Sequence, residues 1–268
     1  MRYTVSMPRA PTHERYPEID LLRTLAVAMM IIYHGAYDLF AYAGWDLNPF
    51  QGGWWLLARG TATLFLLLVG ISFSISFART RAQTNQGDAG ISANATTKKL
   101  KTIYPKYLRR AAIVFGCGML VSLATYIADP ATFVRFGILH MIGISLLLLP
   151  FFAPFAEANI FVGLLCIILG NISKDFTVST WLLLPLGLMP PSFETVDYFP
   201  LLPWFGVILF GVACGHFLYI RSPHWRQSFS AYRVPLPAIL TWPGRNALLI
   251  YLLHQPILLG VLWLIQRH

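Results

Sequence analysis

The chain has few charged residues for its length. Of its 268 residues, 12% are Asp, Glu, Lys or Arg, about half the proportion of roughly 25% that is usual in soluble domains. The charges are also unequal, because 20 Lys and Arg residues stand against 11 Asp and Glu residues and leave a formal net charge of +9. A nucleic-acid-binding protein with this balance carries more charges and shorter apolar runs. Since 56% of the residues are hydrophobic, the composition predicts an integral membrane protein.

Cysteine is scarce as well, and its spacing excludes two common uses. The three cysteines, Cys117, Cys166 and Cys214, lie inside apolar segments, and none has the close paired spacing of a disulfide framework or a zinc site. We interpret them as buried apolar residues and expect no metal site. The N-terminal stretch has no apolar core before a small-residue cleavage site, so we expect the first hydrophobic helix to be the targeting signal. No repeat of 20–50 residues and no inverted symmetry between the halves is evident.

The long apolar runs predict an all-α fold, a polytopic bundle of membrane-spanning helices. A spanning helix needs about 20 mostly apolar residues. A shorter apolar stretch at 178–189 contains Pro185, and we interpret it as re-entrant or interfacial; it would be an eighth span if it crossed. We expect a tail at 1–17 and a single transmembrane domain at 18–268. Seven spans are expected near Ile19–Tyr42, Trp54–Ala78, Tyr107–Ile127, Phe136–Phe155, Asn159–Ile172, Pro200–Ile220 and Arg245–Ile265.

Charge asymmetry predicts the orientation of these spans. If the N-terminus is cytoplasmic, 15 of the 20 Lys and Arg residues lie on the cytoplasmic side, as the positive-inside rule requires. We therefore expect N-in and C-out, with basic cytoplasmic loops at 79–106 and 221–245. Much of the basic excess is explained by topology alone. Such clusters can also hold an anionic lipid or a phosphorylated cosubstrate.

Ionisable side chains within the expected spans are candidates for a functional site, because each is costly at membrane depth. His34 and Asp38 are four residues apart and share one helix face. Their depths, with those of Arg59 and His140, predict one layer in the outer half, with His254 below it. Each also has a structural explanation: His254 can hydrogen-bond a neighbouring helix, Arg59 can extend to the outer interface, and Asp38 can neutralise Arg59.

Five segments carry a resemblance to a known family. In order they are EIDLLRTLAVAMMIIYHGAYDLF, LFLLLVGIS, RFGILHMIGIS, DYFPLLPWFGVILFG and GRNALLIYLLHQPIL. Together they resemble the heparan-alpha-glucosaminide N-acetyltransferase family, and most closely its small bacterial members. The resemblance implies a multi-span acyltransferase of the bacterial cytoplasmic membrane that takes acetyl-CoA from the cytoplasm and acetylates an external glycan.

The resemblance also implies positions for site residues. The polar active-site position of the first span falls on His34, and the histidine of the last span falls on His254. The lysosomal member is thought to use a histidine in the loop after its first conserved span, whereas residues 41–53 contain none here. Direct transfer with His34 as general base is therefore the simpler expectation.

These observations lead to a hypothesis with two rivals. We expect transfer of an acetyl group from acetyl-CoA to an amine or hydroxyl of an extracytoplasmic glycan or amino sugar, with Asp38 orienting His34 and with Arg59, His140 or His254 stabilising the oxyanion. A proton-coupled transporter and a non-catalytic assembly partner remain alternatives, and acceptor identity, acyl chain length and homo-oligomer formation stay open. The residues expected to hold the cosubstrate are Arg23, Lys98, Lys99, Arg109, Arg110, Arg245 and Asn246.

Overall fold

The computed structural model describes residues 16–87, 95–222 and 237–267, and the side chains of 85–87 and 95–102 are outside that description. Within these ranges the chain forms helices joined by turns, and two isolated bridges replace any β-sheet. The elements are α1 (Pro17–Ala43), α2 (Gly52–Gly87), α3 (Ala95–Ala128), α4 (Ile138–Phe152), η1 (Ala153–Ala158), α5 (Asn159–Ser173), η2 (Trp181–Leu186), α6 (Leu201–Gly215), η3 (His216–Arg221), α8 (Ala238–Arg245) and α9 (Ala247–Gln266).

Six helical stretches of the described chain are long and apolar enough to cross a membrane, which confirms the predicted polytopic helix bundle. One of them, Ile138–Ser173, is interrupted at Ala156, whose backbone is not helical (φ 48°, ψ −122°). The chain reverses there. Gly137, just before α4, contacts Asp197, just before α6, so α4 and α6 begin at the same end of the bundle and run in parallel. In α5, Gly163 meets Gly206 and the later Gly170 meets the earlier Pro203, so α5 runs antiparallel to α6. Counting α4 and α5 separately gives seven helical passes along the bundle, although each of these two helices has only 15 residues.

The first helix shows local signals at both ends. It begins with Pro17 at its first position and has Glu18 and Asp20 in its first turn, where the preset backbone of proline and the negative charge both favour a helix start. It ends at Gly44, which has a left-handed backbone (φ 69°) and donates its N–H to the Leu39 carbonyl. A glycine adopts this conformation at little cost, so the helix stops there.

Small residues set the closest helix contacts. A Cβ at Gly70 would collide with the carbonyl of Ile208, and one at Gly211 with the carbonyl of Leu67. This is the small-residue packing that lets backbones approach within a membrane. At the opposite side of the bundle, a Cβ at Gly244 would collide with the Asp20 carbonyl, so α8 lies directly against α1.

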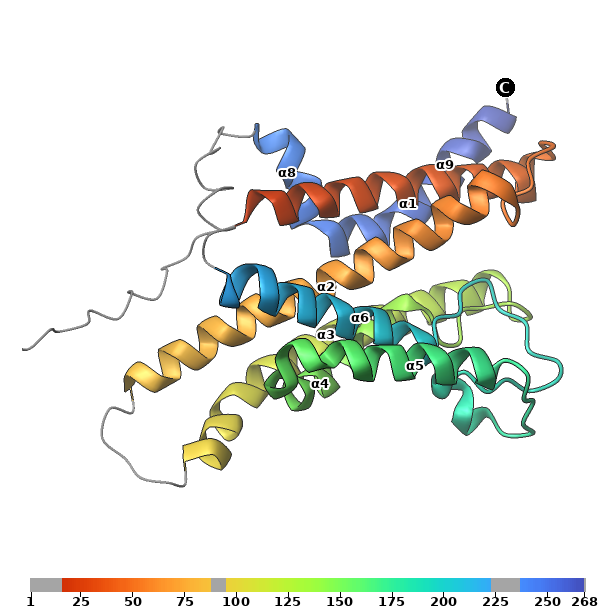
Figure 1. Cartoon of the computed structure of the whole chain (residues 1–268). Helices are drawn as coiled ribbons and strands as arrows, with labels where there is room; N and C mark the ends of the chain where they lie inside the picture. The colour runs from red at the N-terminus through yellow and green to blue at the C-terminus, as the bar shows by residue number, and fades with distance from the viewer. Residues whose placement is uncertain (1–15, 88–94, 223–236, 268) are drawn as a thin grey trace, which may run out of the picture.

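The helices form a layered bundle, shown in Figure 1. The helices α1, α8 and α9 lie together along one side, α4 and α5 lie on the other, and α2 and α6 run between them. The main apolar core is built from α2, α3, α4 and α6, around residues such as Leu66, Met141 and Ile208. The last helix, α9, packs mainly on α1, and its Tyr251 also packs against this core.

Four details differ from expectation or refine it. Much of the predicted basic loop 79–106 is helical, because α2 continues to Gly87 and α3 begins at Ala95, while 88–94 lie outside the described residues. The 221–245 segment ends in the helix α8, and 223–236 are likewise outside the description. The stretch 178–189 contains only the short 3₁₀ helix η2 and does not span. The cysteines are free, and Cys214 is exposed rather than buried.

Candidate active site

Two histidines meet where α1 packs on α9. The His34 and His254 rings lie 4.8 Å apart between centroids and are inclined by 77°. The two helices run in parallel, since Gln266 near the end of α9 donates to the Tyr42 carbonyl near the end of α1. The sequence predicts His254 to lie below His34; the ring contact shows instead that both lie at one depth.

Hydrogen bonds to carbonyls define the tautomer of each ring. Nδ1 of His34 is 2.9 Å from the Met30 carbonyl, and Nδ1 of His254 is 2.6 Å from the Tyr251 carbonyl. A carbonyl oxygen only accepts, so each Nδ1 carries the proton and each neutral ring has its lone pair on Nε2. Nε2 of His254 is buried and has no hydrogen-bond partner among the described residues. A basic nitrogen is thus held in a defined direction.

Asp38 pairs with α9 and not with His34. Its side chain is buried, with 2% of the residue exposed, and its Oδ1 accepts a 2.7 Å hydrogen bond from Nε2 of Gln255. Within the described chain, Asp38 Oδ2 and Gln255 Oε1 have no partner. An unsatisfied buried polar atom costs about 1–3 kcal/mol. His254 Nε2 is a third such atom at this contact, which makes the contact a candidate binding site.

Arg59 lies apart from Asp38. The Arg59 side chain is exposed. Its guanidinium lies over the indole rings of Trp55 and Trp204, at 5.9 and 5.6 Å from their centroids. The alternative in which Asp38 neutralises Arg59 has no support, because Asp38 is paired with Gln255. The cation–π contacts hold Arg59 between α2 and α6.

His140 is enclosed in the α3–α4 hairpin. Its Nδ1 accepts from the Gly137 backbone N–H, and its Nε2 is 3.5 Å from Ser122 Oγ. Its ring stacks on Phe136 and meets the edge of Phe115. Both ring nitrogens therefore have partners within this hairpin, and the structure does not bring His140 to the α1–α9 pair.

A charged cluster lies at the other end of α1. Asp20 is buried and pairs with two arginines: Arg23 at 3.2 Å and Arg245 at 3.1 Å. Arg23 also donates to Ser72 of α2. The cluster joins α1, α2 and α8, and two of the predicted cosubstrate residues, Arg23 and Arg245, meet in it.

More positive charge gathers beside Arg23. Lys106 donates to Ser76 and Thr80 at 3.2 and 2.8 Å, both neutral partners. The charge of Arg110 is close enough to repel those of Arg23 and Lys106. We name Arg23, Lys106, Arg110 and Arg245 the basic cluster. An anion placed among such like charges would relieve their repulsion.

Of the remaining predicted cosubstrate residues, Arg109 and Asn246 make no hydrogen bond or ion pair with this cluster in the described chain. Arg109 is exposed, and Asn246 donates to the Trp242 carbonyl within its own turn. The side chains of Lys98 and Lys99 lie outside the described residues. Lys106 and Gln255 are not among the site residues expected from the sequence. Gln255 is nevertheless a polar residue deep in an apolar run, and it directly follows His254.

A cavity of about 490 Å³ lies at the end of the bundle away from the basic cluster. Its lining is aromatic and polar, with Tyr37, Phe50 and Phe193 beside Thr132 and Glu194. Tyr37 is three residues from His34 along α1, a rise of about 4.5 Å, although neither His34 nor His254 lines the cavity. A ligand with hydroxyl or amine groups matches such a lining.

A buried carboxyl stands at the same end. Asp197 Oδ2 accepts from the backbone N–H of Ile138 at the start of α4, and a Cβ at Gly137 would collide with it. Burial raises the pKa of Asp197 to about 6, and the Ile138 hydrogen bond lowers it by a smaller amount. Asp197 therefore accepts a hydrogen bond from the first N–H of α4 and places an acidic group at the start of that helix. In the described part of the chain no three His, Cys, Asp or Glu residues group closely enough to hold a metal ion.

Comparison with known proteins adds one match. No curated protein and no solved structure matches the chain. A sequence model of the family described as heparan-alpha-glucosaminide N-acetyltransferase, catalytic, matches residues 15–256. That range contains both histidines of the pair and the whole basic cluster. Because the match covers nearly the whole chain, the protein belongs to this family of transmembrane acetyltransferases.

Proposed function

We propose that the protein transfers an acetyl group from acetyl-CoA, bound at the basic cluster, to an amine or hydroxyl of an amino sugar or glycan that enters from the opposite end. The observation that carries this proposal is the His34–His254 pair, with the unpartnered Nε2 of His254 and Oδ2 of Asp38 beside it. The proposed setting is the bacterial cytoplasmic membrane, with the basic cluster on the cytoplasmic side.

The distances along α1 suit this arrangement. Arg23 and His34 are eleven residues apart, a separation of roughly 16 Å along the helix axis. Coenzyme A is elongated, with its phosphates at one end and its thiol at the other. Phosphates on the basic cluster would therefore leave the thioester extended toward the histidines, where the acceptor arrives through the outer cavity.

The proposed reaction needs one proton acceptor. The acceptor nitrogen or oxygen attacks the thioester carbonyl, the new C–N or C–O bond forms, and the C–S bond breaks. Nε2 of His34 takes the proton from the acceptor, and His254 relays it to the leaving thiolate. The buried carboxylate of Asp38 stabilises the imidazolium that forms in between. Asp38 thus acts by charge across the α1–α9 contact, while Gln255 holds it in place.

The first test replaces each histidine. Purified protein in lipid nanodiscs is given radiolabelled acetyl-CoA and glucosamine, and product and free thiol are measured. We expect His34→Ala and His254→Ala each to lower kcat about 100-fold or more, the contribution typical of a general base. Asn171→Ala is the matched control, because it removes a polar side chain from the spanning helix α5 that bonds only its own turn and Lys174. Full activity in His34→Ala would contradict the assignment.

The second test addresses the donor. Arg110→Gln should raise KM for acetyl-CoA about ten-fold, because a charged hydrogen bond to phosphate is lost. With S-acetylpantetheine, which has the thioester but no nucleotide phosphates, the same variant should behave as wild type. Equal effects on both donors would show that Arg110 acts on the fold and not on phosphate.

A proton-coupled transporter is the second candidate, because a buried His–His–Asp group can also relay protons. It would be favoured if the protein releases no thiol from acetyl-CoA and if liposomes containing it take up solute in response to a proton gradient. Replacing His34 would then abolish uptake.

A further inference from the structure

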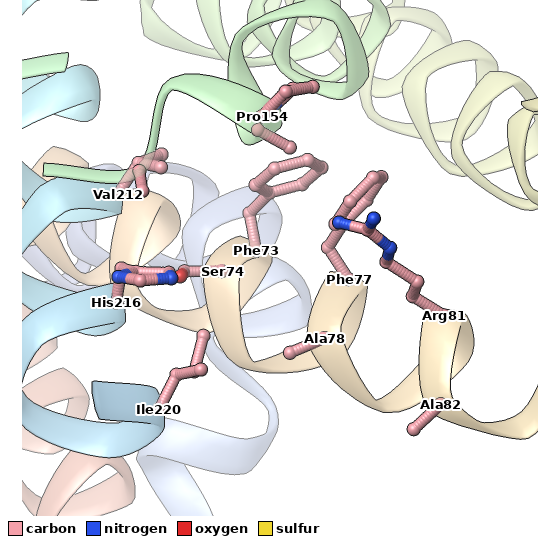
Figure 2. A pocket seen from close by; sticks show the side chains of 12 residues that line it. Phe73, Ser74, Phe77, Ala78, Arg81, Ala82, Pro154, Val212, His216 and Ile220 are labelled. Carbon is pink, nitrogen blue, oxygen red and sulfur yellow. The ribbon is translucent and has the colours of Figure 1, made fainter. Parts of the chain in front are cut away.

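A second cavity lies at the basic end of the bundle, apart from the histidine pair. It has a volume of about 300 Å³ and lies between α2, the η1 turn and the junction of α6 with η3 (Figure 2). None of the residues that line it belongs to the basic cluster or to the α1–α9 site. The proposed acetyl transfer therefore leaves this cavity without a use.

The lining combines apolar side chains with one arginine and one histidine. Phe73, Phe77 and Val212 form apolar walls, and Arg81 and His216 contribute polar groups. Figure 2 shows Phe73, Phe77 and Arg81 reaching in from successive turns of α2, with His216 opposite them. A ligand that fits this lining has an anionic end and an apolar end.

Arg81 has no carboxylate partner in the described part of the chain. Glu157 lies 3.1 Å from Nδ1 of His216 and 3.4 Å from Arg221, so its carboxylate is shared by these two residues. Arg81 makes no hydrogen bond or ion pair with any other residue in the described chain. A planar guanidinium without a carboxylate partner is well suited to bind a phosphate through two hydrogen bonds.

The backbone around the cavity is irregular at two points. Ala156 has a positive φ of 48°, which is uncommon for a residue other than glycine. Residues His216–Arg221 form a π-helix at the end of α6. Short π-helical turns are frequent at functional sites, and irregular backbone at membrane depth occurs where it lines a cavity.

We propose that this cavity binds one anionic phospholipid, with its phosphate on Arg81 and an acyl chain along Phe73 and Phe77. A lipid is favoured over a free phosphate compound because the cavity lies between membrane-spanning helices and its walls are apolar. Basic pockets of this kind at the cytoplasmic side of helix bundles bind anionic headgroups. The site would hold the end of α2 against α6 whether or not the protein transfers acetyl groups.

Native mass spectrometry of the detergent-solubilised full chain tests the proposal. Titration with phosphatidylglycerol should give one retained lipid per chain, and Arg81→Gln should weaken its binding about five-fold, the effect of one cation on an anionic headgroup. Arg79→Gln is the matched control. It removes an equal charge two residues away, from a side chain that stacks on Tyr16 and does not line the cavity. Undiminished binding in Arg81→Gln would overturn the proposal.

Competitors distinguish the sources of phosphate. Phosphatidylcholine should bind more weakly than phosphatidylglycerol, and glycerol 3-phosphate, which has the headgroup phosphate but no chains, should not displace the lipid. Displacement of the lipid by coenzyme A would overturn the proposal by assigning the cavity to the donor. His254→Ala protein should keep its lipid, so a failure of the proposed acetyl transfer and a failure of lipid binding would be recorded separately.

Discussion

Two buried histidines of this chain have opposite surroundings. His140 and His254 are 2% and 8% exposed. His140 has partners for both ring nitrogens inside one hairpin, whereas His254 uses only Nδ1 and presents Nε2 without a partner in the described chain. A satisfied histidine contributes to packing, and one that keeps a free basic nitrogen can accept a proton. Neither burial nor residue type distinguishes them; the neighbouring groups do.

Asp197 provides a pH-dependent prediction at the same scale. Its pKa is raised to about 6 by burial, above the value of about 3.9 in an unfolded chain. Because the folded-state pKa is the higher one, the stability that depends on protonation is complete below about pH 4 and is lost as the pH rises through about 6. Asp197→Asn carries no such proton. The Tm of wild type relative to Asp197→Asn should therefore fall between about pH 4 and 6 and be constant at higher pH.

The measurement is thermal unfolding in detergent, followed by tryptophan fluorescence at a series of pH values for both proteins. Other titrating groups are common to the two proteins and cancel in the difference. A difference in Tm that stays constant from about pH 4 to 7 would contradict the burial of an ionisable carboxyl at this position.

At the scale of elements, the contact between α2 and α6 depends on glycine. Gly211 faces the Leu67 carbonyl, and Gly215 faces Ile71 one turn further along each helix, so the two helices run in parallel. Their close approach places the core residues of α6 against α2. The four-residue spacing of Gly211 and Gly215 is typical of a small-residue contact between membrane helices, and the structure shows that the partner helix is α2.

Gly70→Ala should destabilise this contact. The added Cβ would collide with the Ile208 carbonyl, and overpacking of this kind costs about 1–3 kcal/mol. Gly116→Ala is the same substitution in α3, where nothing lies within 4 Å of the added Cβ, and it should be neutral or stabilising by up to about 1 kcal/mol. Denaturant unfolding in mixed micelles measures both. Equal effects would show that the α2–α6 distance is larger than described.

At the scale of the whole molecule, seven helical passes place the two described ends of the chain at opposite ends of the bundle. Pro17 begins α1 beside the basic cluster, and Gln266 ends α9 beside Tyr42, at the end of α1. The expected N-in, C-out orientation remains a prediction. It would give coenzyme A access to the basic cluster from the cytoplasm and give the acceptor access to the aromatic cavity from outside.

Cysteine labelling tests this orientation. In a variant with Cys117, Cys166 and Cys214 replaced by alanine, Asp46→Cys should react with a membrane-impermeant maleimide in intact cells. Ser222→Cys, at the end of η3, should react only after permeabilisation. The reverse pattern would place the basic cluster outside and contradict both the orientation and the proposed route of the donor.

The part of the fold that can be predicted from the sequence is the part that depends on local pattern. A span is recognised from its own length and apolarity, so the helices of the bundle and the shared face of His34 and Asp38 are predictable residue by residue. The reversal at Ala156 lies between the two spans predicted at Phe136–Phe155 and Asn159–Ile172. The helical extensions beyond Ala78 and before Tyr107 were less predictable. Polar residues there fit a loop or a helix that leaves the membrane equally well.

The sequence by itself determined that this protein is a basic membrane helix bundle with histidines and an aspartate within its spans. Only the tertiary structure decided which of them meet. Gln255 and Asp38 are 217 positions apart, and no local signal shows that α9 packs in parallel on α1. Helices that are apolar on every side have no stripe that specifies a partner, so side-chain packing between helices chooses it. That packing joined His34 to His254 and kept His140 in a separate hairpin.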